Sequence, residues 1–136
     1  EEKVFKPDDG YTYYCITTTG ESASCTWRND IIDNMRYAIG NCFKTREEAD
    51  FEIERRIVVT ELKRFAEEHN ESLGWDDPTK RKWSICVNTF NGNFDFTSTV
   101  LLKYGEVYFS SKELAQQAVQ EIGEELIKKY YLRVDD

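Results

Sequence analysis

Residues 40–49 read GNCFKTREEA, and residues 106–115 read EVYFSSKELA. Both stretches contain Phe, any residue, Thr or Ser, a basic residue, Glu, any residue and Ala, in that order. A Thr or Ser at this place caps the backbone donors of a first helical turn. We therefore expect each stretch to start a helix, and we expect its alanine to let that helix lie close on a sheet.

A β-hairpin is predicted ahead of each copy of this pattern. In the first half, Tyr, Ile and Thr residues favour strands at 11–19 and 22–27. In the second half, strands are predicted at 83–89 and 93–102, on either side of the hairpin signal Asn91-Gly92. A short strand over residues 106–109 is expected to follow.

Two long amphipathic helices are predicted after the repeated pattern. Thr45 and Glu48 fit a capping box for a helix over residues 46–69. Ser110 or Ser111 is expected to cap a helix that runs to about residue 131, with Gly123 as an interruption. The first of these helices has apolar residues on two sides, so we expect it to have two neighbours.

These elements predict an α+β fold made of a duplicated unit, a β-hairpin plus an amphipathic helix, with two long helices packed on antiparallel sheet. The first half is expected at residues 1–72 and the second at residues 73–136. A polar connector with Gly74 and Pro78 joins them. At 136 residues, we expect the two halves to form one compact domain.

The charge of the chain restricts its partners. The formal net charge is −8, which argues against direct binding of nucleic acid. It favours an acidic surface that meets a basic protein, although solubility alone also explains it. No run of 18 apolar residues occurs and no signal peptide is visible, so we expect a cytoplasmic protein that contacts no membrane.

Residues that could do chemistry are few. The chain has one histidine, His69, so a nucleophilic triad is not expected. Its four cysteines form no C-x-x-C pair, so we expect no metal site and no cofactor. Cys15 and Cys25 could face each other across the first hairpin, where either a disulfide or two free thiols would fit. The protein is predicted not to be an enzyme.

A polar and aromatic cluster between the first hairpin and the first long helix is one candidate binding site. Aromatic and arginine side chains on a loop are typical of protein interfaces. The alternative is that Asn29 or Asp30 caps a short helix over residues 31–38 that ends at Gly40 or Asn41, with Asp33 paired to Arg36. The residues of the cluster are Trp27, Arg28, Asn29, Asp30, Asp33, Asn34, Arg36 and Tyr37.

An acidic run at the start of the first long helix is the second candidate. Such a run could imitate phosphates and compete for a basic groove, or it could simply be a solvated face that complements the helix dipole. Its residues are Glu47, Glu48, Asp50, Glu52 and Glu54.

Three segments resemble a group of small accessory proteins of Firmicutes phages and prophages for which no shared activity is known. They are GYTYYCI at 10–16, WRNDIIDNMRYAIGNCFKTREEA at 27–49 and GEVYFSSKELA at 105–115. The resemblance implies a phage or mobile-element accessory protein in a bacterial host cell. Small acidic proteins of this kind often bind and inhibit a host protein, and some inhibit CRISPR nucleases or other defence systems. The expected partner is therefore a host protein, with a basic nucleic-acid-binding protein or nuclease as a candidate.

Two other functions stay open at the level of sequence. The two-sided first helix and the run Ile57-Val58-Val59 fit a structural or assembly protein that forms a homodimer. The aromatic residues Trp27, Tyr37 and Trp83 could instead line a pocket for a nucleotide or another small molecule.

Overall fold

The computed structural model describes residues 4–103 and 105–134 of the chain. It combines helices with antiparallel strands, so the predicted α+β class is confirmed. The chain divides into two compact units, unit 1 at Glu1–Arg56 and unit 2 at Ile57–Asp136. Each unit contains one copy of the repeated sequence pattern.

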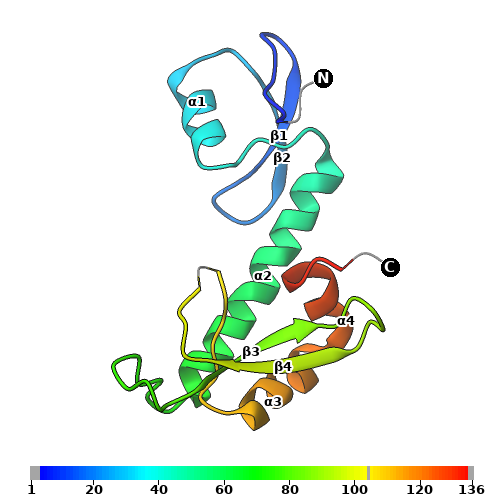
Figure 1. The fold of residues 1–136 in the computed structure, drawn as a ribbon. Coiled ribbons are helices and arrows are strands. Elements are labelled where there is room, and N and C mark those ends of the chain that lie inside the picture. The colour runs from blue at the N-terminus through cyan, green and yellow to red at the C-terminus, as the bar shows by residue number, and fades with distance from the viewer. Residues whose placement is uncertain (1–3, 104, 135–136) are drawn as a thin grey trace. The chain divides into compact units, whose positions relative to one another are not determined.

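Unit 1 begins with the predicted β-hairpin (Figure 1). β1 (Thr12–Ile16) pairs antiparallel with β2 (Ser22–Thr26), and Tyr14 lies opposite Ser24. Gly20 turns the chain between the strands with φ +82°, a conformation that strains residues with a side chain. Both strands are shorter than the sequence suggests.

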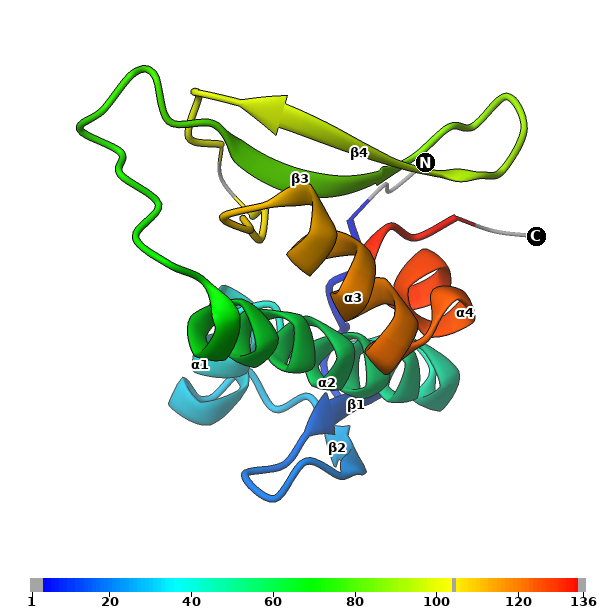
Figure 2. The same ribbon diagram turned by 90° about the horizontal axis from the view of Figure 1, so that it is seen from below.

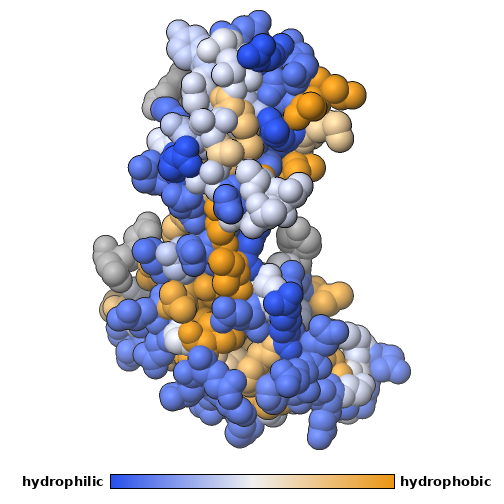
Figure 3. Space-filling view, turned by 180° about the vertical axis from the view of Figure 1, so that it is seen from behind, coloured by the Kyte–Doolittle hydropathy of each residue, from blue (hydrophilic) through white to orange (hydrophobic). Residues whose placement is uncertain are grey.

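The helix α1 (Ile31–Ala38) follows the hairpin at the position predicted for it. Asp30 is its N-cap, and the Asp30 carboxylate accepts a hydrogen bond from the Asp33 N–H at 2.9 Å. Gly40, with φ +75°, ends the helix, and the N–H groups of Gly40 and Asn41 bond back to the last turn as in a Schellman motif. Hydrophobic side chains gather on the surface of unit 1 over this helix (Figure 3).

The repeated phenylalanine adds a third segment to each hairpin. In unit 1 the Phe43 N–H donates to the Tyr14 carbonyl at 2.8 Å, and the Tyr14 N–H donates to the Phe43 carbonyl at 2.9 Å. In unit 2 Phe109 and Trp83 exchange the same two bonds, both at 2.8 Å. Each phenylalanine is thus held against the first strand of its own hairpin, which explains the first position of the repeat.

The hydroxyl residue of the repeat caps the helix that follows. The Thr45 and Ser111 hydroxyls accept hydrogen bonds from the N–H groups of Glu48 and Leu114, both at 3.2 Å. The Glu48 carboxylate in turn accepts from the Lys44 N–H at 3.2 Å. The reciprocal bond of the predicted capping box therefore goes to the residue before the cap.

The helices α2 (Arg46–His69) and α3 (Lys112–Ile122) start directly after these caps. Ala49 and Ala115, the last residues of the repeat, are both fully buried in the first turns of their helices. The bounds of α2 are those predicted. Three of the shared positions thus have a structural role in both copies: the phenylalanine pairs with a strand, the hydroxyl residue caps the helix and the alanine packs closely.

Unit 2 consists of a second hairpin covered by helices. β3 (Lys82–Val87) pairs antiparallel with β4 (Phe94–Thr99). α3 lies along one face of this hairpin, between the hairpin and α2 (Figure 2). Within residues 4–103 and 105–134, the strands form two separate two-stranded sheets, one in each unit, rather than a single sheet.

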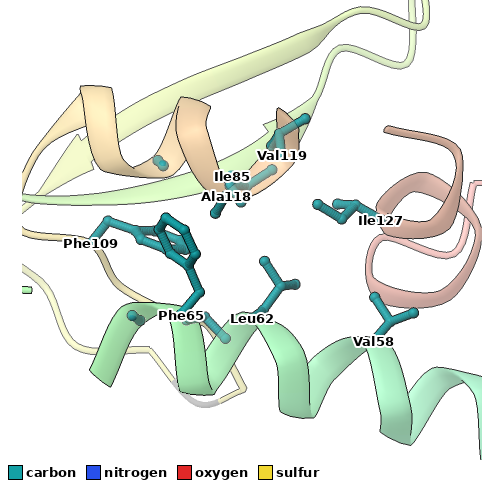
Figure 4. Packing of buried hydrophobic residues seen from close by; sticks show 11 residues of the cluster. Val58, Leu62, Phe65, Ile85, Phe109, Ala118, Val119 and Ile127 are labelled. Carbon is teal, nitrogen blue, oxygen red and sulfur yellow. The ribbon is translucent and has the colours of Figure 1, made fainter. Parts of the chain in front are cut away.

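The core of unit 2 lies between α2 and the hairpin with its covering helix. Leu62 and Phe65 point from α2 toward Ile85 on β3 and toward α3, and Val58 points toward Ile127 (Figure 4). Phe109 is fully buried beside Phe65, with 6.2 Å between the ring centroids. The side of α2 that carries Val58, Leu62 and Phe65 therefore faces the core of unit 2.

The predicted continuous helix to residue 131 is wrong. Gly123 has φ +114° and ψ 131°, which a residue with a side chain rarely adopts, so α3 ends at Ile122. The chain continues as a single turn, α4 (Glu124–Leu126), and then as a π-helical turn (Ile127–Tyr131). Gly123 is thus a break in the helix and not a tolerated interruption.

The predicted short strand over residues 106–109 is reduced to the bridge at Phe109. Side chains take the backbone groups that a strand partner would use. The Val107 N–H donates to the Tyr131 hydroxyl at 3.0 Å, and the Asn70 amide donates to the Tyr108 carbonyl at 2.8 Å.

The sequence repeat predicts a boundary between residues 72 and 73. The boundary between the two compact units lies inside α2. The first turns of α2 belong to unit 1, where Ala49 is buried. From Ile57 onward the helix supplies the core of unit 2.

Candidate functional site

Among the described residues, α1 has the most unusual surface, because the polar side of this helix faces the interior of unit 1. Asp33 lies near the middle of the helix and is only 3% exposed. Its carboxylate accepts a hydrogen bond from the Tyr13 hydroxyl of β1 at 2.5 Å and from the Arg28 backbone N–H at 2.7 Å. A buried carboxylate is stable only with such donors, so these bonds fix the side of α1 that faces the hairpin.

Arg36, one turn after Asp33, belongs to the same network. Its guanidinium donates to the Tyr13 hydroxyl at 3.0 Å and lies 4.0 Å from the Asp33 carboxylate. Tyr13 therefore donates to one charged residue of α1 and accepts from the other. These polar contacts join α1 to β1.

The hydrogen bonds of the network favour the charged forms of Asp33 and Arg36 and the neutral form of Tyr13. The bond from the Tyr13 hydroxyl, helped by the Arg28 N–H, lowers the pKa of Asp33 against the opposing effect of burial. Burial and the bond to Asp33 raise the pKa of Tyr13, and the bond to Tyr13 raises the pKa of Arg36. At neutral pH Asp33 is an anion and Tyr13 keeps its proton, which makes their hydrogen bond a charge-assisted one.

Aromatic rings fill the space beside this network. Trp27 is 2% exposed and meets Tyr13 and Tyr37 edge to face, with ring centroids 5.8 Å and 6.4 Å away. The Lys6 ammonium lies 5.4 Å from the centroid of the Tyr37 ring and 6.0 Å from that of Trp27. The Trp27 ring thus packs against α1 through Tyr37 and against β1 through Tyr13.

The outer side of α1 is apolar and solvent-exposed. We call its four large residues the apolar arc: Ile31, Ile32, Met35 and Ile39, which are 75%, 54%, 63% and 74% exposed. Ile31, Met35 and Ile39 follow one another at intervals of four residues, which places them in one row along the helix. Ile32 widens this row on one side. An amphipathic helix normally buries its apolar side, so α1 is reversed.

A hollow of about 580 Å³ opens beside the N-terminal end of α1. We call it the acidic hollow, because two of its lining residues, Asp8 and Asp9, are exposed carboxylates. Asn29, which directly precedes the N-cap Asp30, lies in its wall and accepts a hydrogen bond from the Asn34 amide at 3.1 Å. The remaining lining residues are Lys6, Pro7 and Trp27.

The structure brings the predicted polar and aromatic cluster together around α1, but it divides the cluster between the interior and the surface. Trp27 and Asp33 are buried and Tyr37 and Arg36 are half-buried, so these four support the helix. The exposed members are Arg28, Asn29, Asp30 and Asn34.

The predicted acidic run lies on the first turns of α2 within unit 1. Glu52 is half-buried and pairs with Arg55 and with Arg56, the latter at 3.6 Å. It is therefore occupied by an internal ion pair. The exposed members of the run are Glu47, Glu48, Asp50 and Glu54.

The sequence reasoning missed the apolar arc. The spacing of its residues is visible in the sequence, but periodicity does not say which side of a helix is buried. The one available signal was Asp33, a carboxylate placed opposite the apolar row. Its partner Tyr13 lies twenty residues away, so the contact could not be inferred from local spacing.

Across 4–103 and 105–134, no group of three or more His, Cys, Asp and Glu residues could hold a metal ion. No helix in those ranges is long and apolar enough to cross a membrane. Of the aromatic residues predicted to line a ligand pocket, Trp27 and Tyr37 belong to unit 1 and Trp83 to unit 2.

No family model, no curated protein and no solved structure matches this chain. The resemblance to small phage accessory proteins remains a prediction from the sequence.

Proposed function

We propose that this chain is a non-enzymatic accessory protein of phage or mobile-element origin that binds a host protein and inhibits it. The observation that supports the proposal is the reversed orientation of α1. Its charged residues Asp33 and Arg36 are used inside unit 1, while its isoleucines and methionine lie on the surface.

The apolar arc is large enough to be the centre of an interface. Its four side chains are each more than half exposed and adjoin one another, and the largest apolar patch on a typical monomer, about 300–600 Å², is often functional. A standard interface buries about 800 Å² on each partner, with an apolar centre and a polar rim. The arc would supply the centre, and Asp30 and Asn34 would belong to the rim.

The shape of α1 sets the shape of its partner. A single exposed helix is convex, and Ile31, Met35 and Ile39 form one ridge along it. Such a ridge fits a concave apolar groove, the arrangement in which one protein receives an amphipathic helix of another. We therefore expect the host protein to present a groove that receives this ridge.

The charge of the chain sets the charge of the groove's rim. Asp8, Asp9 and Asp30 are exposed near the N-terminal end of the arc, together with Lys6 and Arg28. A basic side chain on the rim could enter the acidic hollow. A second copy of the chain would instead bring another net charge of −8, so we favour a basic host protein over a homodimer.

The exposed acids at the start of α2 would help to attract such a partner over a longer range. Glu47, Asp50 and Glu54 lie in unit 1 with the apolar arc. A nucleic-acid-binding protein or nuclease has the required basic surface. An anti-defence role, of which inhibition of a CRISPR nuclease is one form, fits this chemistry.

The test is affinity capture from bacterial lysate with three forms of the chain at low and high salt. The first form is unchanged, and the second is the double variant Ile31→Ser, Met35→Ser. The third, Leu102→Ser, is the matched control, because Leu102 is 72% exposed and lies in unit 2. We expect a basic protein that the unchanged chain and the control retain and the double variant loses.

The captured protein is then purified, and its activity is measured with and without the chain. Added salt should weaken capture, since attraction between exposed charges is screened. Capture that is equal for all three forms would overturn the role of the apolar arc. A partner whose activity is unchanged by a saturating amount of chain would overturn inhibition while leaving binding intact.

A further inference from the structure

Two cysteine side chains lie in contact on the hairpin of unit 1. Cys15 is opposite Ala23 and Cys25 is opposite Tyr13, so the two cysteines are diagonal neighbours on adjacent strands. Their sulfur atoms are 3.0 Å apart. Both side chains pack with the cluster that contains Tyr13 and Trp27, on the same face of the hairpin.

The backbone around the pair is held on both sides by hydrogen bonds. The hairpin is closed by the Gly20 turn, where the Thr17 N–H donates to the Glu21 carbonyl at 2.8 Å. On the other edge of β1, Tyr14 is bridged to Phe43. A bond between Cys15 and Cys25 would need their sulfur atoms to approach from 3.0 Å to about 2.0 Å.

The two thiols differ in access. Cys15 is 3% exposed, whereas Cys25 is half-buried. Burial, together with the contact to Cys25, raises the pKa of Cys15 to about 11. A reagent from solution therefore meets Cys25 first, and Cys15 reacts second.

A third thiol, Cys42, packs against the same cluster, and burial raises its pKa to about 11 as well. It is the internal competitor for Cys25. The sulfur of Cys25 is in contact with that of Cys15, which makes Cys15 the favoured partner. Cys86 lies in unit 2 and provides an unpaired reference.

We propose that Cys15 and Cys25 form a site of reversible oxidation to a disulfide that staples the β1–β2 hairpin. The oxidant is a small disulfide such as oxidised glutathione. The Cys25 thiolate attacks one sulfur of that disulfide, forms a mixed disulfide and releases one glutathione thiol. The Cys15 thiolate then attacks the Cys25 sulfur and releases the second, so that two protein thiols are oxidised and one disulfide is reduced to two thiols.

The disulfide would stabilise β1, the strand that holds α1 and its apolar arc in place. Tyr13, which holds Asp33 and Arg36, lies two residues before Cys15 on β1. Closing the hairpin covalently restricts the unfolded chain and secures this strand beneath α1. The inference concerns the hairpin alone and does not depend on the identity of a partner.

The experiment equilibrates the full chain in glutathione buffers from fully reduced to fully oxidised, blocks the remaining thiols with an alkylating reagent and maps the peptides by mass spectrometry. We expect a peptide pair linked through Cys15 and Cys25, with Cys42 and Cys86 alkylated. The oxidised chain should unfold at a temperature higher by roughly 5–10 °C.

The variants Cys25→Ser and Cys86→Ser separate this pair from the other thiols. Cys25→Ser should abolish both the linked peptide and the shift in unfolding temperature, and Cys86→Ser should leave both unchanged. Four alkylated cysteines at every buffer ratio would overturn the proposal. A link from Cys25 to Cys42, or glutathione left bound on Cys25, would also overturn it.

Discussion

The two units share one plan and differ in what fills it. Each has a hairpin, a phenylalanine bridged to the first strand and a capped helix. Unit 2 encloses an apolar cluster around Leu62 and Phe109, whereas unit 1 encloses a smaller aromatic cluster and the Tyr13–Asp33–Arg36 network. We infer that unit 2 provides stability, and that the polar contacts of unit 1 hold α1 with its apolar side exposed.

The bridged phenylalanines offer the largest test of this difference. Phe109→Ala removes a fully buried ring and should lower the free energy of unfolding of unit 2 by about 4 kcal/mol. Phe43→Ala removes a half-buried ring and should cost about 1–2 kcal/mol. Urea unfolding followed by circular dichroism gives both numbers. Equal losses would mean that the two bridges carry similar cores.

The tyrosine hydroxyls give the next largest effect. Tyr13→Phe removes one hydrogen bond from Asp33 and one from Arg36, and it should lower stability by about 2 kcal/mol. Tyr131→Phe in unit 2 removes the acceptor for one backbone N–H, that of Val107, and should cost about 1 kcal/mol. Amide hydrogen exchange would show where each loss occurs. If Tyr13→Phe leaves exchange in α1 unchanged, the network does not hold the helix.

Two glycines with positive φ can be compared in the same way. Gly123→Ala should cost about 1–2 kcal/mol, because the added methyl meets only Leu126 at 3.9 Å and the cost is backbone strain. Gly40→Ala has nothing within 4 Å and should cost about 1 kcal/mol. Thermal unfolding measures both. A stabilised Gly123→Ala variant would show that α3 can continue through residue 123.

The pH dependence of α1 is a smaller effect, confined to acid. The folded pKa of Asp33 is lowered, so its contribution is present above the unfolded pKa of about 3.9 and is lost as pH falls through the folded value. The protection of the α1 amides, measured against their intrinsic exchange rates, should therefore fall below about pH 4 in the unchanged chain. In Asp33→Asn this loss of protection should be absent, since no proton is taken up there. The same acid response in both forms would assign it to other carboxylates.

Much of the fold could be predicted, because its helix caps and turns depend on residues that are neighbours in the sequence. Thr45, Ser111 and Asp30 cap helices through neighbours a few residues away, and Gly20 turns a hairpin between strand-forming residues. The candidate site could be predicted only in part. The polar cluster of residues 27–37 does surround α1, but the burial of Asp33 depends on Tyr13 of another element.

The two further differences from expectation have separate origins. The broken helix at Gly123 follows from a backbone conformation, which glycine permits but does not require. The lost strand at 106–109 follows from side chains of Asn70 and Tyr131 that occupy its backbone groups. These contacts join distant segments, which spacing along the chain does not encode.

Site-directed photocrosslinking tests the role of the apolar arc most directly. A photoreactive amino acid replaces Met35 in one sample and Leu102 in another, two exposed positions in different units. After irradiation in host lysate, we expect one discrete adduct with a basic protein from position 35 and no such adduct from position 102. Equal adducts from both positions, or only chain-to-chain adducts from position 35, would contradict the account.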